Sequence, residues 1–285
     1  MKKIAILPTL LTLGNGVCGF AAIAYASKIK PVNPIDQESA HYFFLSGWLI
    51  LAAMLFDVLD GYVARLSRTA SDFGGQLDSL CDAISFGAAP AFLLLRLGQD
   101  WEAPTIRNAI PIIAALYMVC AILRLARFNL ENAPDPAAHK RFRGLPSPAA
   151  AGCLASLAML RGQPPVSLAE YAPLLQGFVK LWAPSGALVV ALLMVSRISY
   201  PHLTKQLLRG RRHFSYVVRV VLAVFLIVLL QDLALVFVFW GYALTFLARH
   251  AVLRTLDKRR LRTPSALTLP SPPGGGGGGR VGGAE

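Results

Sequence analysis

The chain has 285 residues, of which 55% are hydrophobic and 15% are charged, and its formal net charge is +13. Soluble domains carry about 25% charged residues, so this composition excludes an ordinary water-soluble fold. Long apolar stretches separated by short polar ones predict an all-α polytopic membrane bundle. The positive charges lie in the junctions between these stretches and in the C-terminal tail. Anionic lipid headgroups are therefore a better partner for them than nucleic acid.

Apolar runs of about 20 residues mark the expected membrane spans. We predict eight spans, and seven is the competing count because only Gln231 and Asp232 separate the last two runs. In chain order the predicted spans are residues 4–26, 41–64, 79–98, 108–128, 146–161, 173–196, 214–231 and 233–250. The stretch Gly144-Leu145-Pro146 is expected to form the turn into the short fifth span.

These spans divide the chain into three predicted parts. Residues 1–200 would form a membrane core of six helices, and residues 201–262 would add two further spans with basic cytoplasmic flanks. Residues 263–285 form a Pro/Gly-rich tail that includes an unbroken glycine run, 274–279. Such a tail has too little apolar surface to bury and is expected to be disordered.

The first apolar run follows Lys2 and Lys3 and superficially resembles a signal peptide, but it has no clear small-residue cleavage site. We therefore expect a retained first helix. With that helix in place, most lysines and arginines fall on the side of the N-terminus, and the opposite turns are mainly acidic. The positive-inside rule then predicts a multi-pass protein of the cell (inner) membrane with both termini in the cytoplasm.

Four aspartates flank the junction between the second and third predicted spans. Asp57 and Asp60 are three residues apart, and Asp78 and Asp82 are four apart. Both spacings place the pair on one helix face, and a short connection lets the two helices pack antiparallel with the pairs facing each other. Carboxylates that converge at membrane depth repel unless cations neutralise them. Hard oxygen ligands favour Mg²⁺ or Mn²⁺, and two such ions are a frequent device of phosphoryl transfer.

The residues around the aspartates suit a phosphate-bearing ligand. Gly61 and Ala64 leave room beside the helix backbone, and Gly74 is expected to do the same in the connecting loop. Arg65 is suited to bidentate phosphate binding, and Ser71 offers a hydroxyl group. Purely interfacial polar residues are the plainer explanation, but it does not account for this combination.

The whole stretch resembles the signature of the CDP-alcohol phosphotransferase family. The matching pattern is Asp57-x2-Asp60-Gly61-x2-Ala64-Arg65-x8-Gly74-x3-Asp78-x3-Asp82. The resemblance implies that Asp57 and Asp78 bridge two divalent ions, that Asp60 holds one, and that Asp82 holds the other. It also implies that Asp82 is the general base, and that the protein is a homodimer. The residues that would contact the CDP-lipid donor are Gly61, Ala64, Arg65, Ser71 and Gly74.

Three flanking segments are similar to the phosphatidylserine synthase branch of that family. They are PTLLTLGNGVCGF (8–20), SFGAAPA (85–91) and RLARFNL (124–130), the last followed by FRGLPSPAAA (142–151). Thr9 departs from the branch, which often has asparagine there. The resemblance implies CDP-diacylglycerol as the donor and L-serine as the acceptor, with phosphatidylserine and CMP as products.

Several polar residues are candidates for the remaining contacts. Arg124, Arg127, Asn129, Arg141 and Arg143 could bind the carboxylate of serine or a phosphate, although positive-inside topology alone explains such arginines equally well. Thr12 and Asn15 could reach the nucleotide or simply form bonds between helices.

Two other functions remain open from the sequence. The same chemistry could serve another alcohol, such as glycerol 3-phosphate or inositol phosphate. A cation-coupled transporter would also place aspartates inside a membrane, but it leaves Gly61, Arg65 and Gly74 without a role.

Overall fold

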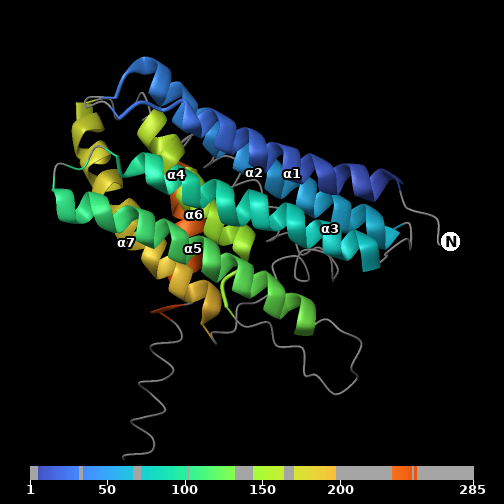
Figure 1. The fold of residues 1–285 in the computed structure, drawn as a ribbon. Helices are drawn as coiled ribbons and strands as arrows, with labels where there is room; N and C mark the ends of the chain where they lie inside the picture. The colour runs from blue at the N-terminus through green and yellow to red at the C-terminus, as the bar shows by residue number, and fades with distance from the viewer. Residues whose placement is uncertain are drawn as a thin grey trace, which may run out of the picture. The chain divides into compact units, whose positions relative to one another are not determined.

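The computed structural model describes residues 6–31, 35–66, 72–99, 101, 103–131, 144–163, 170–196, 233–245 and 247–248. The helices of this part of the chain lie in one compact unit, Met1–Leu247. They are α1 (Ile6–Ser27), α2 (Gln37–Leu66), α3 (Asp72–Asp82), the π-helical turn η1 (Ala83–Ala88), α4 (Ala89–Leu97), α5 (Pro104–Glu131), α6 (Ser147–Gly162), α7 (Ala172–Val195) and the short helix Leu233–Thr245 (Figure 1). The predicted all-α fold is confirmed.

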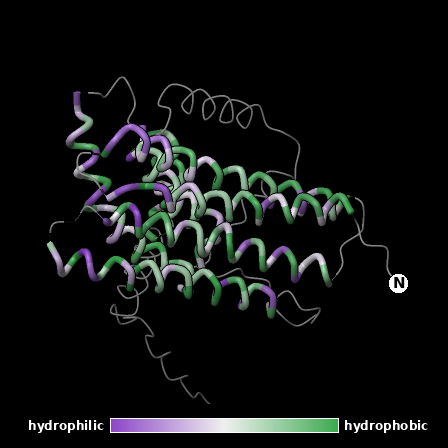
Figure 2. The backbone as a smooth tube through the Cα atoms, turned by 45° about the horizontal axis from the view of Figure 1, so that its top comes forward, coloured by the Kyte–Doolittle hydropathy of each residue, from purple (hydrophilic) through white to green (hydrophobic). Residues whose placement is uncertain are grey.

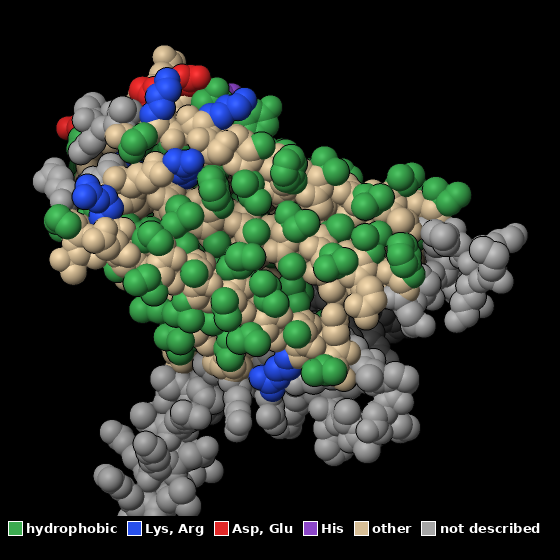
Figure 3. All heavy atoms as spheres, in the orientation of Figure 1, with side chains coloured by type: hydrophobic (Ala, Val, Ile, Leu, Met, Phe, Trp, Pro, Cys, Tyr) green, Lys and Arg blue, Asp and Glu red, His purple; other side chains and the backbone are tan. Residues whose placement is uncertain are grey.

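Among the described residues, five segments are long and apolar enough to cross a membrane: Ile6–Ser27, Gln37–Ala64, Phe73–Leu97, Pro104–Leu130 and Ala172–Val195. Hydrophobic residues run along these helices (Figure 2). In the space-filling view apolar side chains cover much of the visible face, while most charged side chains gather toward its upper left (Figure 3). Large apolar side chains such as Phe20 and Leu181 are 67% and 66% exposed, as expected where lipid covers the surface. The protein is a multi-pass helical membrane protein.

The total of eight spans stays a prediction. The predicted seventh span, 214–231, lies outside the described residues. Of the predicted eighth span, 233–250, the structure shows the short helix Leu233–Thr245. The fifth predicted span corresponds to α6, which has only 16 residues.

The prediction for the start of the third span is wrong. The helix begins at Asp72, not at residue 79, and continues through η1 and α4 to Leu97. Its first turns are polar, so a search for apolar runs misses them. Gly74 therefore lies within α3 and not in a loop, and Asp78 lies near the middle of that helix.

The π-helical turn η1 directly follows Asp82. It is fixed from two sides, because Ser85 Oγ donates a hydrogen bond to the Asn15 carbonyl of α1 (2.9 Å) and the buried Tyr117 hydroxyl of α5 donates one to the Phe86 carbonyl (3.1 Å). Such turns are rare and occur mostly at functional sites. This one sets the direction in which α3 leaves the aspartates.

Helix α1 packs closely against both α2 and α3. Two glycines allow this approach. A Cβ atom at Gly16 would lie 3.0 Å from Cys81 Sγ, and one at Gly19 would overlap Ser85. The face of α1 that carries Asn15 is thereby brought against the helix that carries Asp82.

The turn predicted at residues 144–146 is confirmed. Gly144 has a φ of 91°, and a Cβ atom there would collide with the Met194 carbonyl. The Leu145 amide donates a hydrogen bond to the Leu193 carbonyl (3.0 Å). The turn thus attaches the start of α6, at Ser147, to the end of α7.

The helix Leu233–Thr245 packs on α6 and α7 (orange in Figure 1). Trp240 Nε1 donates a hydrogen bond to the Cys153 carbonyl (3.0 Å), and its ring fills the space left by Gly186. Phe239 lies against Gly152 in the same way. The helix Leu233–Thr245 is therefore joined to α6 and α7 by specific contacts.

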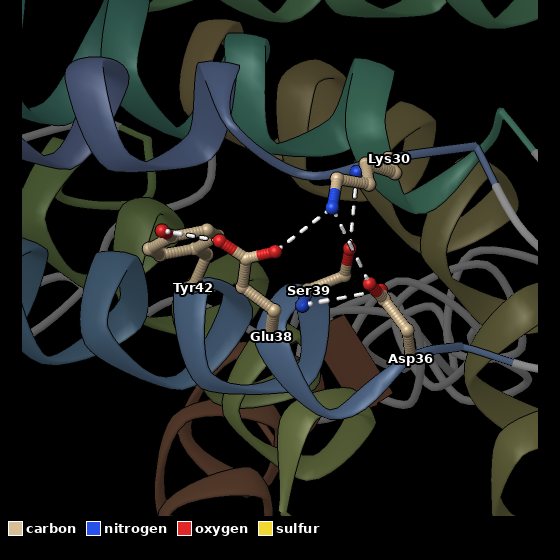
Figure 4. Close-up of polar contacts among 5 residues, drawn as sticks. All are labelled: Lys30, Asp36, Glu38, Ser39 and Tyr42. Carbon is tan, nitrogen blue, oxygen red and sulfur yellow. Dashed lines mark hydrogen bonds and ion pairs between the residues drawn. The ribbon is translucent and has the colours of Figure 1, made fainter.

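The turn between α1 and α2 is closed by a polar network (Figure 4). Lys30 Nζ donates to Glu38 Oε2 (2.8 Å) and lies 3.8 Å from Asp36 Oδ2. The Lys30 amide donates to Ser39 Oγ (3.0 Å), the Ser39 amide donates to Asp36 Oδ1 (3.2 Å), and the Tyr42 hydroxyl donates to Glu38 Oε1 (3.0 Å). Lys30, Asp36 and Glu38 therefore each have an opposite charge or a hydrogen bond within this network.

Candidate active site

Three aspartate side chains meet between α2 and α3. One carboxylate oxygen from each of Asp57, Asp60 and Asp78 lies within 4.8 Å of the others. The spacing of three residues places Asp57 and Asp60 on the same face of α2. In this region both α2 and α3 pack against α1. The aspartate side chains of α2 and α3 approach each other next to α1.

These carboxylates are sheltered from solvent, and Asp57 and Asp78 have no cationic side chain paired with them among the described residues. Asp60 is 5% exposed, and Asp57 and Asp78 are half-buried. Within the described ranges no lysine, arginine or histidine forms an ion pair with Asp57 or Asp78. The Oδ1 atom of Asp78 is buried and receives no hydrogen bond from these residues.

Like charges brought together in a sheltered place repel one another, and oxygen-only ligand sets are those that Mg²⁺ and Mn²⁺ prefer. The cluster of Asp57, Asp60 and Asp78 can therefore hold a divalent metal ion. The side chains present fit the group that the sequence predicts.

Asp82 lies one helical turn beyond Asp78 and is 8% exposed. Its Oδ1 atom accepts a hydrogen bond from Asn15 Nδ2 of α1 (2.9 Å). It interacts electrostatically with Asp57, Asp78 and Asp60, so it belongs to the same acidic region. Asp82 thus differs from the three aspartates that lie together, because its carboxylate accepts a hydrogen bond from the Asn15 amide.

A cationic side chain faces the acidic cluster from α5. Arg124 is half-buried and interacts electrostatically with Asp82 and Asp57. Its Nη1 atom donates a hydrogen bond to Ser147 Oγ at the start of α6 (2.5 Å). The guanidinium group is therefore fixed near the carboxylates without forming an ion pair with them.

Asn129 lies further along α5 and contacts α3. Its Nδ2 atom donates a hydrogen bond to Ser79 Oγ (2.8 Å), and this hydroxyl donates to the Gly75 carbonyl (3.0 Å). Asn129 is thus placed beside the residue that follows Asp78. Arg127 lies between Arg124 and Asn129 on the same helix.

The candidates for the CDP-lipid contacts are only partly described. Gly61 and Ala64 are half-buried on α2, just beyond Asp60, and Gly74 lies on α3. The side chain of Arg65 and the whole of Ser71 lie outside the described residues. Arg141 and Arg143 also lie outside them, so the roles of these three arginines and of Ser71 stay predictions.

On α1 the two polar candidates make local or interhelical bonds. Thr12 Oγ1 donates a hydrogen bond to the Pro8 carbonyl (3.0 Å), and Asn15 forms the bond to Asp82. Of the two alternatives for Asn15, the bond between helices is present. A nucleotide contact from either residue stays a prediction.

The sequence reasoning did not single out three residues that shape this region. Ser147 binds Arg124, Ser79 binds Asn129, and Tyr242 interacts electrostatically with Arg124. Ser79 had a weak signal, since it is a polar residue next to Asp78 in an apolar stretch. Ser147 and Tyr242 had none, because their partners are distant in the sequence.

The described helices form a membrane protein in which α2 and α3 bring together three carboxylates that can hold a divalent ion. The sequence profile of the CDP-alcohol phosphatidyltransferase family matches residues 5–199. The chain belongs to this family, and it is an enzyme. The short helix Leu233–Thr245 lies beyond the matched residues.

Curated relatives carry one name. The chain is 32% identical over 206 residues to the CDP-diacylglycerol–serine O-phosphatidyltransferase of Helicobacter pylori (strain J99), covering 72% of this chain and 76% of the relative. A relative of the same name from Bacillus subtilis is 32% identical over 200 residues, covering 70% and 92%. A third, from Methanocaldococcus jannaschii, is 39% identical over 153 residues, covering 54% and 62%.

Proposed function

We propose that this enzyme transfers the phosphatidyl group of CDP-diacylglycerol to L-serine, forming phosphatidylserine and releasing CMP. The observation that carries the proposal is the meeting of Asp57, Asp60 and Asp78, with Asp82 next to them, in a chain of the CDP-alcohol phosphatidyltransferase family. The serine acceptor is supported by the shared name of relatives from bacteria, an archaeon and yeast.

Asp57, Asp60, Asp78 and Asp82 would hold a pair of Mg²⁺ or Mn²⁺ ions. When bound, the ions would supply positive charge to the pyrophosphate oxygens of the donor and to the departing CMP. The three carboxylates that lie together support this assignment, because their mutual repulsion needs cations to offset it.

Asp82 would accept the proton of the serine hydroxyl as that oxygen attacks the phosphorus atom attached to diacylglycerol. The bond between this phosphorus and the CMP oxygen breaks, and its electron pair leaves with CMP. A carboxylate is a weak base, so much of the rate must come from the position of Asp82 relative to the acceptor.

Arg124 would bind the carboxylate of serine, assisted by Arg127 and Asn129. Its place is suited to this because it faces Asp82 and Asp57 while Ser147 fixes one end of its guanidinium group. Arg141 and Arg143 would add positive charge at the same mouth. Positive-inside topology is the competing explanation for these arginines.

Gly61, Ala64, Arg65, Ser71 and Gly74 would bind the CDP part of the donor, which enters from the bilayer. The aspartates would lie at the cytoplasmic side of the cell (inner) membrane, with both termini in the cytoplasm. The family resemblance further implies a homodimer.

The decisive test supplies the purified enzyme with CDP-diacylglycerol, Mg²⁺ or Mn²⁺, and one alcohol at a time. We expect CMP release with L-serine and none above background with glycerol 3-phosphate or inositol phosphate. Release with another alcohol instead of serine would contradict the proposed acceptor while leaving the reaction class intact. Cation flux without CMP release would contradict the reaction class itself.

A further inference from the structure

Asn15 occupies a buried position on α1 beside Asp82. It is 0% exposed, and its Nδ2 atom donates to Asp82 Oδ1 at 2.9 Å. In the part of the chain that the structure describes, this is the hydrogen bond that Asp82 receives. One acceptor position of the carboxylate is therefore filled and its rotation is restricted.

The backbone of Asn15 is fixed as well as its side chain. Its carbonyl oxygen accepts the hydrogen bond from Ser85 Oγ (2.9 Å), and Ser85 lies in the π-helical turn just after Asp82. Gly16 and Gly19 allow the two helices to approach closely on either side of this contact. The close packing of α1 on this segment thus keeps Asn15 beside Asp82, and the Ser85 hydrogen bond adds to the stability of that packing.

The Asn15 side chain uses only one of its two ends. Its Oδ1 atom is buried and has no hydrogen-bond donor among the described residues. A buried amide that merely joined two helices would be expected to have both ends satisfied. The hydrogen bond that the Asn15 side chain does form is the one from Nδ2 to the carboxylate of Asp82.

We infer that Asn15 is a positioning residue that orients the Asp82 carboxylate for proton transfer from the acceptor alcohol. The inference rests on the proposed function, because it takes Asp82 as the base. Proton transfer by a positioned side chain contributes about 10²–10⁴-fold to a rate, and its efficiency depends on the angle and distance of the accepting oxygen. Asn15 acts through Asp82 and does not touch the substrates.

The test compares two variants that each remove one buried hydrogen bond between α1 and the α3–η1 segment. Asn15→Ala removes the bond to Asp82, and Ser85→Ala removes the bond to the Asn15 carbonyl without changing Asp82. For Asn15→Ala we expect kcat to fall by about 10–100-fold, with KM for serine and CDP-diacylglycerol within about threefold of the unsubstituted enzyme. For Ser85→Ala we expect a lower thermal unfolding midpoint and kcat within about twofold.

If Asn15→Ala does not fold, Asn15→Ser serves the same purpose, since its hydroxyl is one bond shorter and falls short of Asp82. Binding of CDP-diacylglycerol and the thermal unfolding midpoint are measured alongside turnover. Equal kcat values for the Asn15 and Ser85 variants would overturn the inference, because the bond would then be structural only. A rise in KM for CDP-diacylglycerol with unchanged kcat would overturn it in favour of a nucleotide contact.

The proposed function can fail separately. If the unsubstituted enzyme prefers another alcohol, the acceptor is wrong, and the two variants are compared with that alcohol. If Asp82→Asn retains near-normal turnover, the assigned base is wrong. If Asp82→Asn is inactive while Asn15→Ala keeps full kcat, only the role of Asn15 is wrong.

Discussion

Acidic residues lie at both ends of α2, in opposite surroundings. Near its start, Asp36 and Glu38 are exposed and contact Lys30, Ser39 and Tyr42 (Figure 4). Near its end the surroundings of Asp57 and Asp60 include further aspartates of α3, and three of these carboxylates lie within 4.8 Å of one another.

The difference distinguishes acidic residues that stabilise the fold from acidic residues that cost stability. At the start of α2 each negative charge is offset by a partner on the same turn. At its end, charges of like sign are sheltered together, which destabilises the protein unless a cation binds. Sites that bear such a cost are typically retained for function.

The largest expected effect on turnover comes from removing a carboxylate of the acidic cluster near the end of α2. Asp78→Asn should lower turnover by at least about 100-fold, since even groups that only support a metal ligand contribute about 10–100-fold. In the absence of divalent ions the same variant should unfold at a higher temperature than the unsubstituted enzyme, because one repelling charge is gone. CMP release and thermal unfolding in a chelator measure the two effects.

Asp36→Asn is the matched control at the opposite end of α2. It removes a carboxylate that accepts the Ser39 amide and lies 3.8 Å from Lys30. Turnover should be unchanged and the unfolding temperature should fall. Stability changes of the same sign in the two variants would show that the comparison between the two ends is wrong.

Removal of divalent ions should affect variants at the two ends of α2 differently. Ligand at 100 times its dissociation constant stabilises a folded protein by about 2.7 kcal/mol. Adding EDTA should therefore abolish CMP release and lower the unfolding temperature of the unsubstituted enzyme, and Mg²⁺ or Mn²⁺ should restore both. Asp36→Asn should respond equally, whereas Asp78→Asn should respond little. A full response in Asp78→Asn would exclude that aspartate from the metal site.

A smaller and more selective effect is expected from substitution of an arginine near the acidic cluster, compared with an arginine near the turn between α1 and α2. Arg124→Lys keeps the charge but loses the planar group that contacts Ser147. A hydrogen bond to a charged group contributes about 1.5–3 kcal/mol, so KM for serine should rise by about 10–100-fold with KM for CDP-diacylglycerol little changed. Arg96→Lys is the control, because Arg96 of α4 donates to the Ser27 carbonyl near the opposite end of α1 (3.2 Å). Equal KM values for serine in both variants would mean that Arg124 serves only the positive-inside charge distribution and does not bind serine.

Local geometry explains what the sequence could predict. The spacings of Asp57 with Asp60 and of Asp78 with Asp82 fix a shared helix face, so the meeting of Asp57, Asp60 and Asp78 followed from helix periodicity. The turn at Gly144 followed from its residue types. Both features depend on a few neighbouring residues.

Features that depend on distant partners were not predictable. Asn15 and Asp82 are 67 residues apart, and nothing in either local sequence chooses this bond over a nucleotide contact. The first turns of α3 were missed because they are polar, and they are nonetheless helical beside α1. Hydrophobic periodicity reports which surface faces lipid, and at a polar site within a membrane protein that signal is lost.

The smallest expected effect concerns the pairing at the start of α2. The hydrogen bond to Glu38, with the nearby charges of Glu38 and Asp36, raises the pKa of Lys30 above its usual 10.5. The hydrogen bond from Ser39, and to a lesser degree the charge of Lys30, lowers the pKa of Asp36 below its usual 3.8. The stabilisation from Lys30 is therefore complete below pH 10.5 and lost at higher pH, whereas that from Asp36 is complete above pH 3.8 and lost as the pH falls further.

Lys30→Met should accordingly unfold at a slightly lower temperature than the unsubstituted enzyme at pH 7, and the gap should narrow when the pH falls well below 3.8. The effect is small because these side chains are exposed and screened by solvent. Thermal unfolding of both proteins at the two pH values measures the gap. A gap that stays constant with pH would mean that Lys30 contributes through the packing of its aliphatic chain and not through its charge.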